Sequence, residues 1–341
     1  MHSRIGSTFA TLPCILVIAL SACGSNPKHA DSASSVVPLD DKPSANTGVV
    51  SSADSHTPSG EVSRAMKAIE GKQFAEAKNI LEKAINANSA DVLAHYYMGV
   101  ACGGLADSSC AANSFRRAIE LDQKFAEAYV NLSALQLDQK DFAGSLATVE
   151  AGLKHTNHPD LYLNRAIALE SLGKKDDAAS AYGVAVEHMP DNFSLRLTYA
   201  QLLLANEKKV EALAQIQKVR ESDDPKLLAI AAIVARQLEA FADCVAILDR
   251  AISLKDLAAL RVRRGMCRED LKDVTGARVD FERAISIDSK FGPAHYYYGV
   301  MLEKGKDNKK ACSEFALAIE QGGNEGVGPQ AKKASAALGC H

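Results

Sequence analysis

Residues 94–100 read AHYYMGV, and residues 294–300 read AHYYYGV. A second pair of related phrases follows at the same offset, FRRAIE at 115–120 and FALAIE at 315–320. The two copies lie 200 residues apart, a distance that a period in the thirties divides into six. The chain is therefore expected to contain internal repeats of one supersecondary unit.

Two series of small residues define the repeat. One series recurs at steps of 32 to 34 residues: Ala77, Ala111, Ser145, Ala178, Ala212, Cys244, Ala277 and Ala311. The other lies twelve residues before each of these: Ala65, Gly99, Ser133, Ala166, Ala200, Ala232, Gly265 and Gly299. Large apolar residues follow the first series at a helical spacing of four: Leu81, Phe115, Val149, Tyr182, Ile216, Leu248, Phe281 and Phe315. This pattern predicts two helices per repeat that approach each other closely.

The pattern resembles the tetratricopeptide repeat, a helix–turn–helix unit of about 34 residues. In that family's numbering, the earlier small residue is position 8 and the later one is position 20. The resemblance implies an all-α superhelical solenoid of about eight repeats over residues 59–321, followed by a C-terminal capping helix in 322–341. The family's tryptophan at position 4 is absent throughout, and its proline at position 32 is clear only as Pro190.

The N-terminus carries an export signal. A short apolar stretch over residues 9–20 ends in Leu20-Ser21-Ala22-Cys23, which resembles the lipobox of bacterial lipoproteins. The stretch is too short to span a bilayer. The resemblance implies that residues 1–22 are removed and that Cys23 is lipidated, which would anchor the chain stably. Gly24 favours the outer membrane. An ordinary signal peptide cleaved after Ala22 is the alternative.

Residues 23–58 are rich in Ser, Ala, Asp, Pro and Asn and show no helical period. This composition predicts a disordered tether between the lipid and the repeats. The whole chain has a formal net charge of −3, which is no electrostatic footprint for nucleic acid. We expect no nucleic-acid partner, and a membrane contact through the lipid anchor only.

Six cysteines remain in the exported chain, an even number that suggests disulfides. The repeat framework places them on adjacent helices as three pairs: Cys102 with Cys110, Cys244 with Cys267, and Cys312 with Cys340. Buried free thiols are the first alternative. A metal site is the second, although no metal-ligand spacing of His and Cys occurs.

No residue pattern predicts catalysis, and we expect neither an enzyme nor a cofactor. His95 and His295 occupy the bulky position 4 and are expected to pack. His155 and His158 could chelate a metal weakly from a loop. Arginines recur at position 7, namely Arg64, Arg165 and Arg264, and their charged ends are expected to stay in water.

Position 6 of the first helix faces the concave groove in this family. Six residues there are candidates for peptide binding: Tyr97, Asn131, Asn164, Thr198, Arg263 and Tyr297. Asn131 and Asn164 are consecutive in the series and resemble the asparagine ladder with which some members hold an extended backbone. Both side chains are expected to face solvent in the free protein. An idle solvated face is the alternative.

The sequence thus predicts a membrane-anchored scaffold or adaptor of the bacterial cell envelope, which binds a partner protein or an extended peptide in its concave groove. One alternative is a subunit that presents substrate to an envelope enzyme. Another is an assembly factor similar to the pilotins of pilus secretins, and a third is a structural component that stacks on itself.

Overall fold

The computed structural model describes residues 56–323 and 326–340. Within these ranges the chain forms seventeen α-helices and no strands. They are α1 (Gly60–Glu70), α2 (Phe74–Ala87), α3 (Val92–Gly104), α4 (Ser108–Leu121), α5 (Ala126–Asp138), α6 (Phe142–Gly152), α7 (Pro159–Ser171), α8 (Lys175–His188), α9 (Phe193–Ala205), α10 (Lys209–Val219), α11 (Pro225–Gln237), α12 (Phe241–Leu254), α13 (Ala258–Asp270), α14 (Val274–Ile287), α15 (Gly292–Lys304), α16 (Asn308–Gly322) and α17 (Gly328–Leu338).

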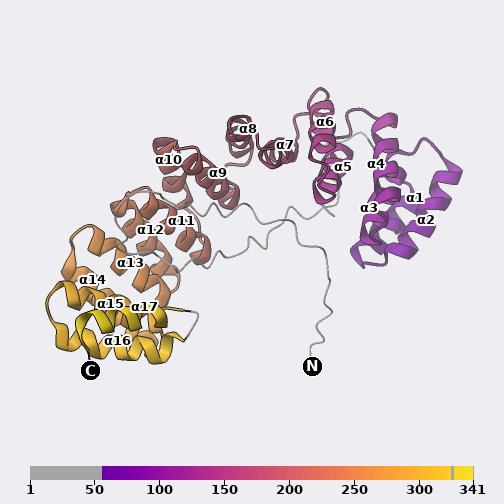
Figure 1. Cartoon of the computed structure of the whole chain (residues 1–341). Helices are drawn as coiled ribbons and strands as arrows, with labels where there is room; N and C mark the ends of the chain where they lie inside the picture. The colour runs from indigo at the N-terminus through magenta and orange to yellow at the C-terminus, as the bar shows by residue number, and fades with distance from the viewer. Residues whose placement is uncertain (1–55, 324–325, 341) are drawn as a thin grey trace.

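The helices pair in chain order and stack into an open arch (Figure 1). From α5 to α14 the odd-numbered helices line the hollow side of the arch, which we call the inner face, and the even-numbered helices lie on its outer side. The last helix, α17, packs against α15 and α16 at the C-terminal end. The prediction of an all-α solenoid is confirmed.

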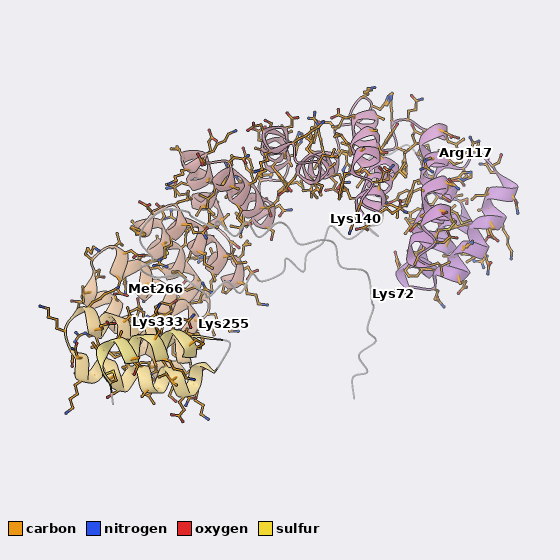
Figure 2. The ribbon with its side chains drawn as sticks, in the orientation of Figure 1. Lys72, Arg117, Lys140, Lys255, Met266 and Lys333 are labelled. Carbon is orange, nitrogen blue, oxygen red and sulfur yellow. A yellow bond between two sulfur atoms is a disulfide. The ribbon has the colours of Figure 1, made fainter. Side chains whose placement is uncertain are left out.

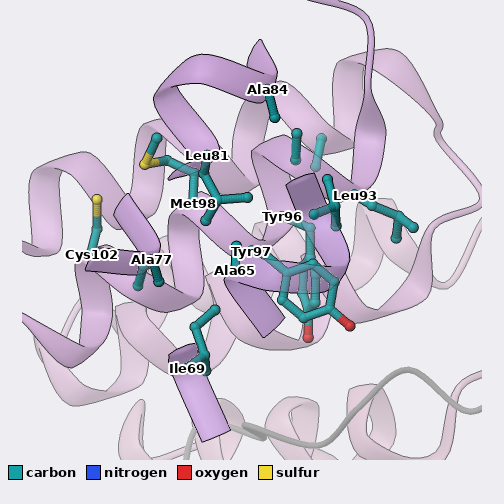
Figure 3. Packing of buried hydrophobic residues seen from close by; sticks show 14 of the residues in the cluster. Ala65, Ile69, Ala77, Leu81, Ala84, Leu93, Tyr96, Tyr97, Met98 and Cys102 are labelled. Atoms are coloured by element: carbon teal, nitrogen blue, oxygen red, sulfur yellow. The ribbon is translucent and has the colours of Figure 1, made fainter. Parts of the chain in front are cut away.

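Small residues at positions 8 and 20 let the two helices of each repeat come together. Figure 3 shows this packing around Ala65 and Ala77, which are both fully buried. Where position 8 is glycine, the space is filled by the aromatic ring at position 24. A methyl group added at Gly99 would lie 2.5 Å from the Phe115 ring, so the close approach requires glycine there.

The turn between the two helices has the same conformation in all eight repeats. The residue at position 15 adopts a positive φ in each: Lys72, Ala106, Lys140, Gly173, Glu207, Glu239, Lys272 and Lys306. Lys72 and Lys140 are labelled in Figure 2. Only one of the eight is glycine, although a left-handed backbone costs other residues about 1–2 kcal/mol. The repeats therefore carry local strain that the packing of the two helices overcomes.

Helix capping differs along the array. The second helix begins with an aspartate N-cap in four repeats: Asp107, Asp141, Asp273 and Asp307 each accept from a backbone N–H. In the three middle repeats the corresponding residues are Lys174, Lys208 and Ala240, and none makes a side-chain cap. A missing cap costs a helix about 1 kcal/mol, so the middle of the array is locally the weaker part.

The seventh repeat has an ionic core in place of an apolar one. Asp280 on α14 is fully buried, and Arg264 Nε donates to it at 2.9 Å. Arg268 Nη1 donates to it at 2.7 Å, and Arg261 Nη1 at 3.3 Å. The expectation that the charged end of Arg264 stays in water is wrong, because Asp280 and Asp249 both accept from its guanidinium group inside the repeat.

The three expected cysteine pairs lie at bonding distance. Their Cα atoms are 5.7 Å apart for Cys102 and Cys110, 6.2 Å for Cys244 and Cys267, and 5.5 Å for Cys312 and Cys340. Each pair joins helices that follow one another in the array, or α16 to the residue after α17. The signal peptide, Cys23 and all of the tether before residue 56 lie outside the described residues. Among the described helices, none is both long and apolar enough to cross a bilayer.

Candidate peptide-binding surface

The residues at position 6 lie along the inner face but differ in exposure. Asn131 is only 4% exposed and Asn164 only 2%. The expectation that both face solvent is therefore wrong. Tyr97 is also buried, whereas Thr198, Arg263 and Tyr297 are half-buried. Next to the narrow helix pairs of this fold, position 6 is covered by the first helix of the neighbouring repeat.

Asn164 on α7 bridges two repeats. Its Nδ2 donates to Ser133 Oγ at 2.8 Å and to the Val130 carbonyl oxygen at 3.2 Å, both on α5. Ser133 itself is fully buried and donates back to Val130. The Asn164 amide thus satisfies a buried polar pair at the α5–α7 contact, which makes it a part of the fold.

Asn131 on α5 makes a similar bridge with one half of its amide. Its Nδ2 donates to the Tyr96 hydroxyl on α3 at 2.9 Å. Its Oδ1 is buried and has no hydrogen-bond partner. A buried amide oxygen left unpaired costs about 1–3 kcal/mol, so this acceptor is suited to a donor from outside the chain.

A small cavity opens beside Asn131. Its walls are Tyr96 on α3, Glu127, Val130 and Asn131 on α5, and His158 at the start of α7. It encloses about 10 Å³, which is room for one water-sized group. Burial raises the pKa of the Tyr96 hydroxyl, and the neighbouring Tyr97 and Glu127 raise it further, while the Asn131 hydrogen bond lowers it. The carboxylate of Glu127 therefore acts on this site electrostatically.

The duplicated tyrosine pairs have the same geometry and different exposure. The rings of Tyr96 and Tyr97 lie beside each other in Figure 3, with centroids 5.0 Å apart and edge-to-face. Tyr296 and Tyr297 repeat this arrangement at 5.1 Å. Both rings of the second pair are half-exposed, whereas both of the first are buried. The C-terminal pair thus leaves aromatic surface accessible on the inner side of α15.

The remaining candidates have structural partners. Thr198 donates to the Ser194 carbonyl of its own helix. His295 is buried between Glu314 and the Ser289 carbonyl, and His95 lies against the Ser89 carbonyl, so both pack as expected.

Metal binding by the loop histidines has no support in the part of the chain that the structure describes. His158 Nδ1 accepts from the Asp160 backbone N–H and caps α7, and His155 is exposed. No group of three or more potential metal ligands occurs among the described residues.

Sequence reasoning missed Glu127 as a site residue. The signal was present, because Glu127 and Asn131 are four residues apart and so lie on one face of the same helix. What the sequence did not reveal is that α3 and α7 close around them.

A family model described as a tetratricopeptide repeat matches residues 163–225. The comparison supports the tetratricopeptide repeat family. Repeats of this kind mediate protein–protein interactions and typically act as scaffolds without catalysis. No curated protein matches the chain.

Several solved structures share the fold. Yeast Tom70 is 16% identical over 84% of this chain and 65% of that chain, with a TM-score of 0.44. PilF of Pseudomonas aeruginosa is 16% identical over 57% of this chain and 90% of that one, with a TM-score of 0.48. YrrB, a repeat protein described as having an unusual peptide-binding site, is 19% identical over 65% of this chain and 100% of its own, with a TM-score of 0.38.

Proposed function

We propose that this chain is a lipid-anchored adaptor of the bacterial cell envelope that binds an extended segment of a partner protein along the inner face of its repeats. The observation that carries the binding role is the unpaired Oδ1 of Asn131, a buried acceptor beside a cavity on α5. A backbone or side-chain donor of a bound segment would satisfy it. Thr198, Arg263 and Tyr297 extend the candidate surface toward the C-terminal end.

Site-specific photocrosslinking tests the inner face. A crosslinking residue is placed at Ile167 on α7 or Gln201 on α9, each three residues beyond a position 6 residue and on the same side of its helix. The matched control is Val210 on the outer helix α10, which is 85% exposed. In native membranes, one partner should crosslink from residues 167 and 201 and not from 210. Equal capture from all three positions would place recognition elsewhere.

The anchor rests on the lipobox resemblance around Cys23. Several acyl chains on one residue hold a protein on a membrane where one chain would be marginal. We expect Cys23→Ala, still exported, to fractionate with soluble periplasmic protein. Continued pelleting of this variant with membranes would argue against lipidation as the anchor. An enzyme, a secretin or only the chain itself in the crosslinked product distinguishes the alternative functions.

A further inference from the structure

The cavity at Asn131 has the chemistry of a cation site. One wall carries the unpaired Asn131 Oδ1, on a side chain that is 96% buried by the measure that leaves it 4% exposed. The carboxylate of Glu127 forms another wall, and no lysine or arginine lines the cavity. An amide oxygen and a carboxylate are both acceptors, so the missing group is a donor, and the carboxylate favours one with positive charge.

Further negative charge lies at the cavity entrance. Asp160 follows His158 in the first turn of α7, and its Oδ2 lies 3.9 Å from His158 Nδ1. Because His158 Nδ1 accepts from the Asp160 backbone N–H, the neutral ring carries its proton on Nε2. Glu127 and His158 are half-exposed, so the cavity is open to solvent on their side.

The size of the cavity selects among cations. With about 10 Å³ it holds one compact group. A lysine ammonium is a compact point charge with three donors, whereas an arginine guanidinium is a planar fork with five. Only the ammonium fits a site of this volume without moving its walls.

The position of the cavity selects the source of the ammonium. It lies between the third and fourth of eight repeats, and the inner face continues on both sides of it. A segment lying along that face would cross the cavity in its middle, where it offers a side chain and not a terminus. We propose that the cavity formed by Tyr96, Glu127, Val130, Asn131 and His158 binds the ammonium group of a lysine side chain in the partner segment. This inference rests on the proposed binding of an extended segment.

The test uses the full mature chain and pools of short peptides with blocked ends. The pools share mixed neutral flanks and differ only in one central residue, which is lysine, Nε-acetyl-lysine, arginine or norleucine. A fifth pool has norleucine at the centre and a free N-terminal amine. Retention on immobilised protein is measured for the parent, Glu127→Gln and Asn131→Leu, and crosslinking from residue 167 is measured in parallel. Glu303→Gln is the matched control, because Glu303 is a half-exposed acid on α15, far along the array.

The parent should retain the lysine pool about 10-fold better than the acetyl-lysine and norleucine pools, since a hydrogen bond to a charged group contributes at least a tenfold factor. Glu127→Gln should abolish most of this preference, and Glu303→Gln should keep it. Asn131→Leu should also lose the preference, with a folded helical spectrum as its control.

Several results would overturn the inference. Equal retention of the lysine and norleucine pools, with crosslinking from residue 167 intact, would remove the lysine site and leave the proposed function standing. Equal losses in Glu127→Gln and Glu303→Gln would show a general charge effect. Preference for arginine or for the free amine would contradict the size or the position argument. Absence of any crosslinking from residue 167 would overturn the proposed function with it.

Discussion

Asn131 and Asn164 occupy the same repeat position and have different hydrogen-bond states. Both amides of Asn164 Nδ2 reach oxygens of α5, so its donor group is fully used inside the protein. Asn131 uses its donor on Tyr96 and leaves its acceptor unpaired. The difference arises from the preceding repeat, which offers Ser133 to one and a tyrosine hydroxyl to the other. Of the two, Asn131 is the residue with capacity for a ligand.

Replacing Asn164 with alanine should therefore weaken the fold. The substitution leaves Ser133 and the Val130 carbonyl without their buried donor, at a cost of about 1–3 kcal/mol. Urea unfolding followed by circular dichroism measures the loss. Thr198→Ala is the matched control at the same repeat position, because Thr198 bonds only to its own helix and should cost little. Equal stability of the two variants would mean that the Asn164 bridge contributes nothing.

At the scale of the repeat element, the turn at position 15 imposes a conformation that the sequence mostly ignores. Seven of the eight residues there are not glycine, and they include alanine, lysine and glutamate. The two helices are therefore held together by their own packing, at positions 8, 20 and 24, and the turn follows. Turn chemistry alone would have located only the fourth repeat, through Gly173.

This difference predicts opposite effects of exchanging glycine and alanine. Gly173→Ala should lower the free energy of unfolding by about 1 kcal/mol, because φ is 73° there and nothing crowds the added methyl. Ala106→Gly, at φ 59°, should raise it by up to about 1 kcal/mol. Thermal melts measure both changes.

Gly103→Ala is the control for helix propensity. Gly103 lies inside α3 with open space around it, so alanine should stabilise this position by about 1 kcal/mol. If Gly173→Ala stabilised the protein as Gly103→Ala does, the strain assigned to the turn would be absent.

At the scale of the whole molecule, the sequence predicted what depends on spacing and missed what depends on neighbours. Small residues such as Ala65 and Ala77 predicted the helix pairs, because their periodicity reflects a contact repeated in every unit. The burial of Asn131 depends on a tyrosine one repeat away, and the Asp280 cluster depends on three arginines that share one helix face only once α13 and α14 pack. Contacts that occur once leave no period to detect.

The arch also predicts how far the effect of a broken disulfide travels. Each repeat contacts mainly its neighbours, so a local loss should stay local. Cys312→Ser removes the link between α16 and the residue after α17, which should release α17 and raise amide hydrogen exchange in α15 to α17. Cys102→Ser should act only on the first repeats, because its partner Cys110 lies on the next helix. Each bridge is expected to contribute about 2–4 kcal/mol. Hydrogen exchange measured on peptides along the non-reduced chain separates the two variants. Because the apolar clusters of the first repeats and of the last ones share no residue, exchange in α1 to α4 should be unchanged by Cys312→Ser. A uniform rise along the array would instead show one cooperative unit, and unchanged exchange at both ends would show that the cysteines are not paired.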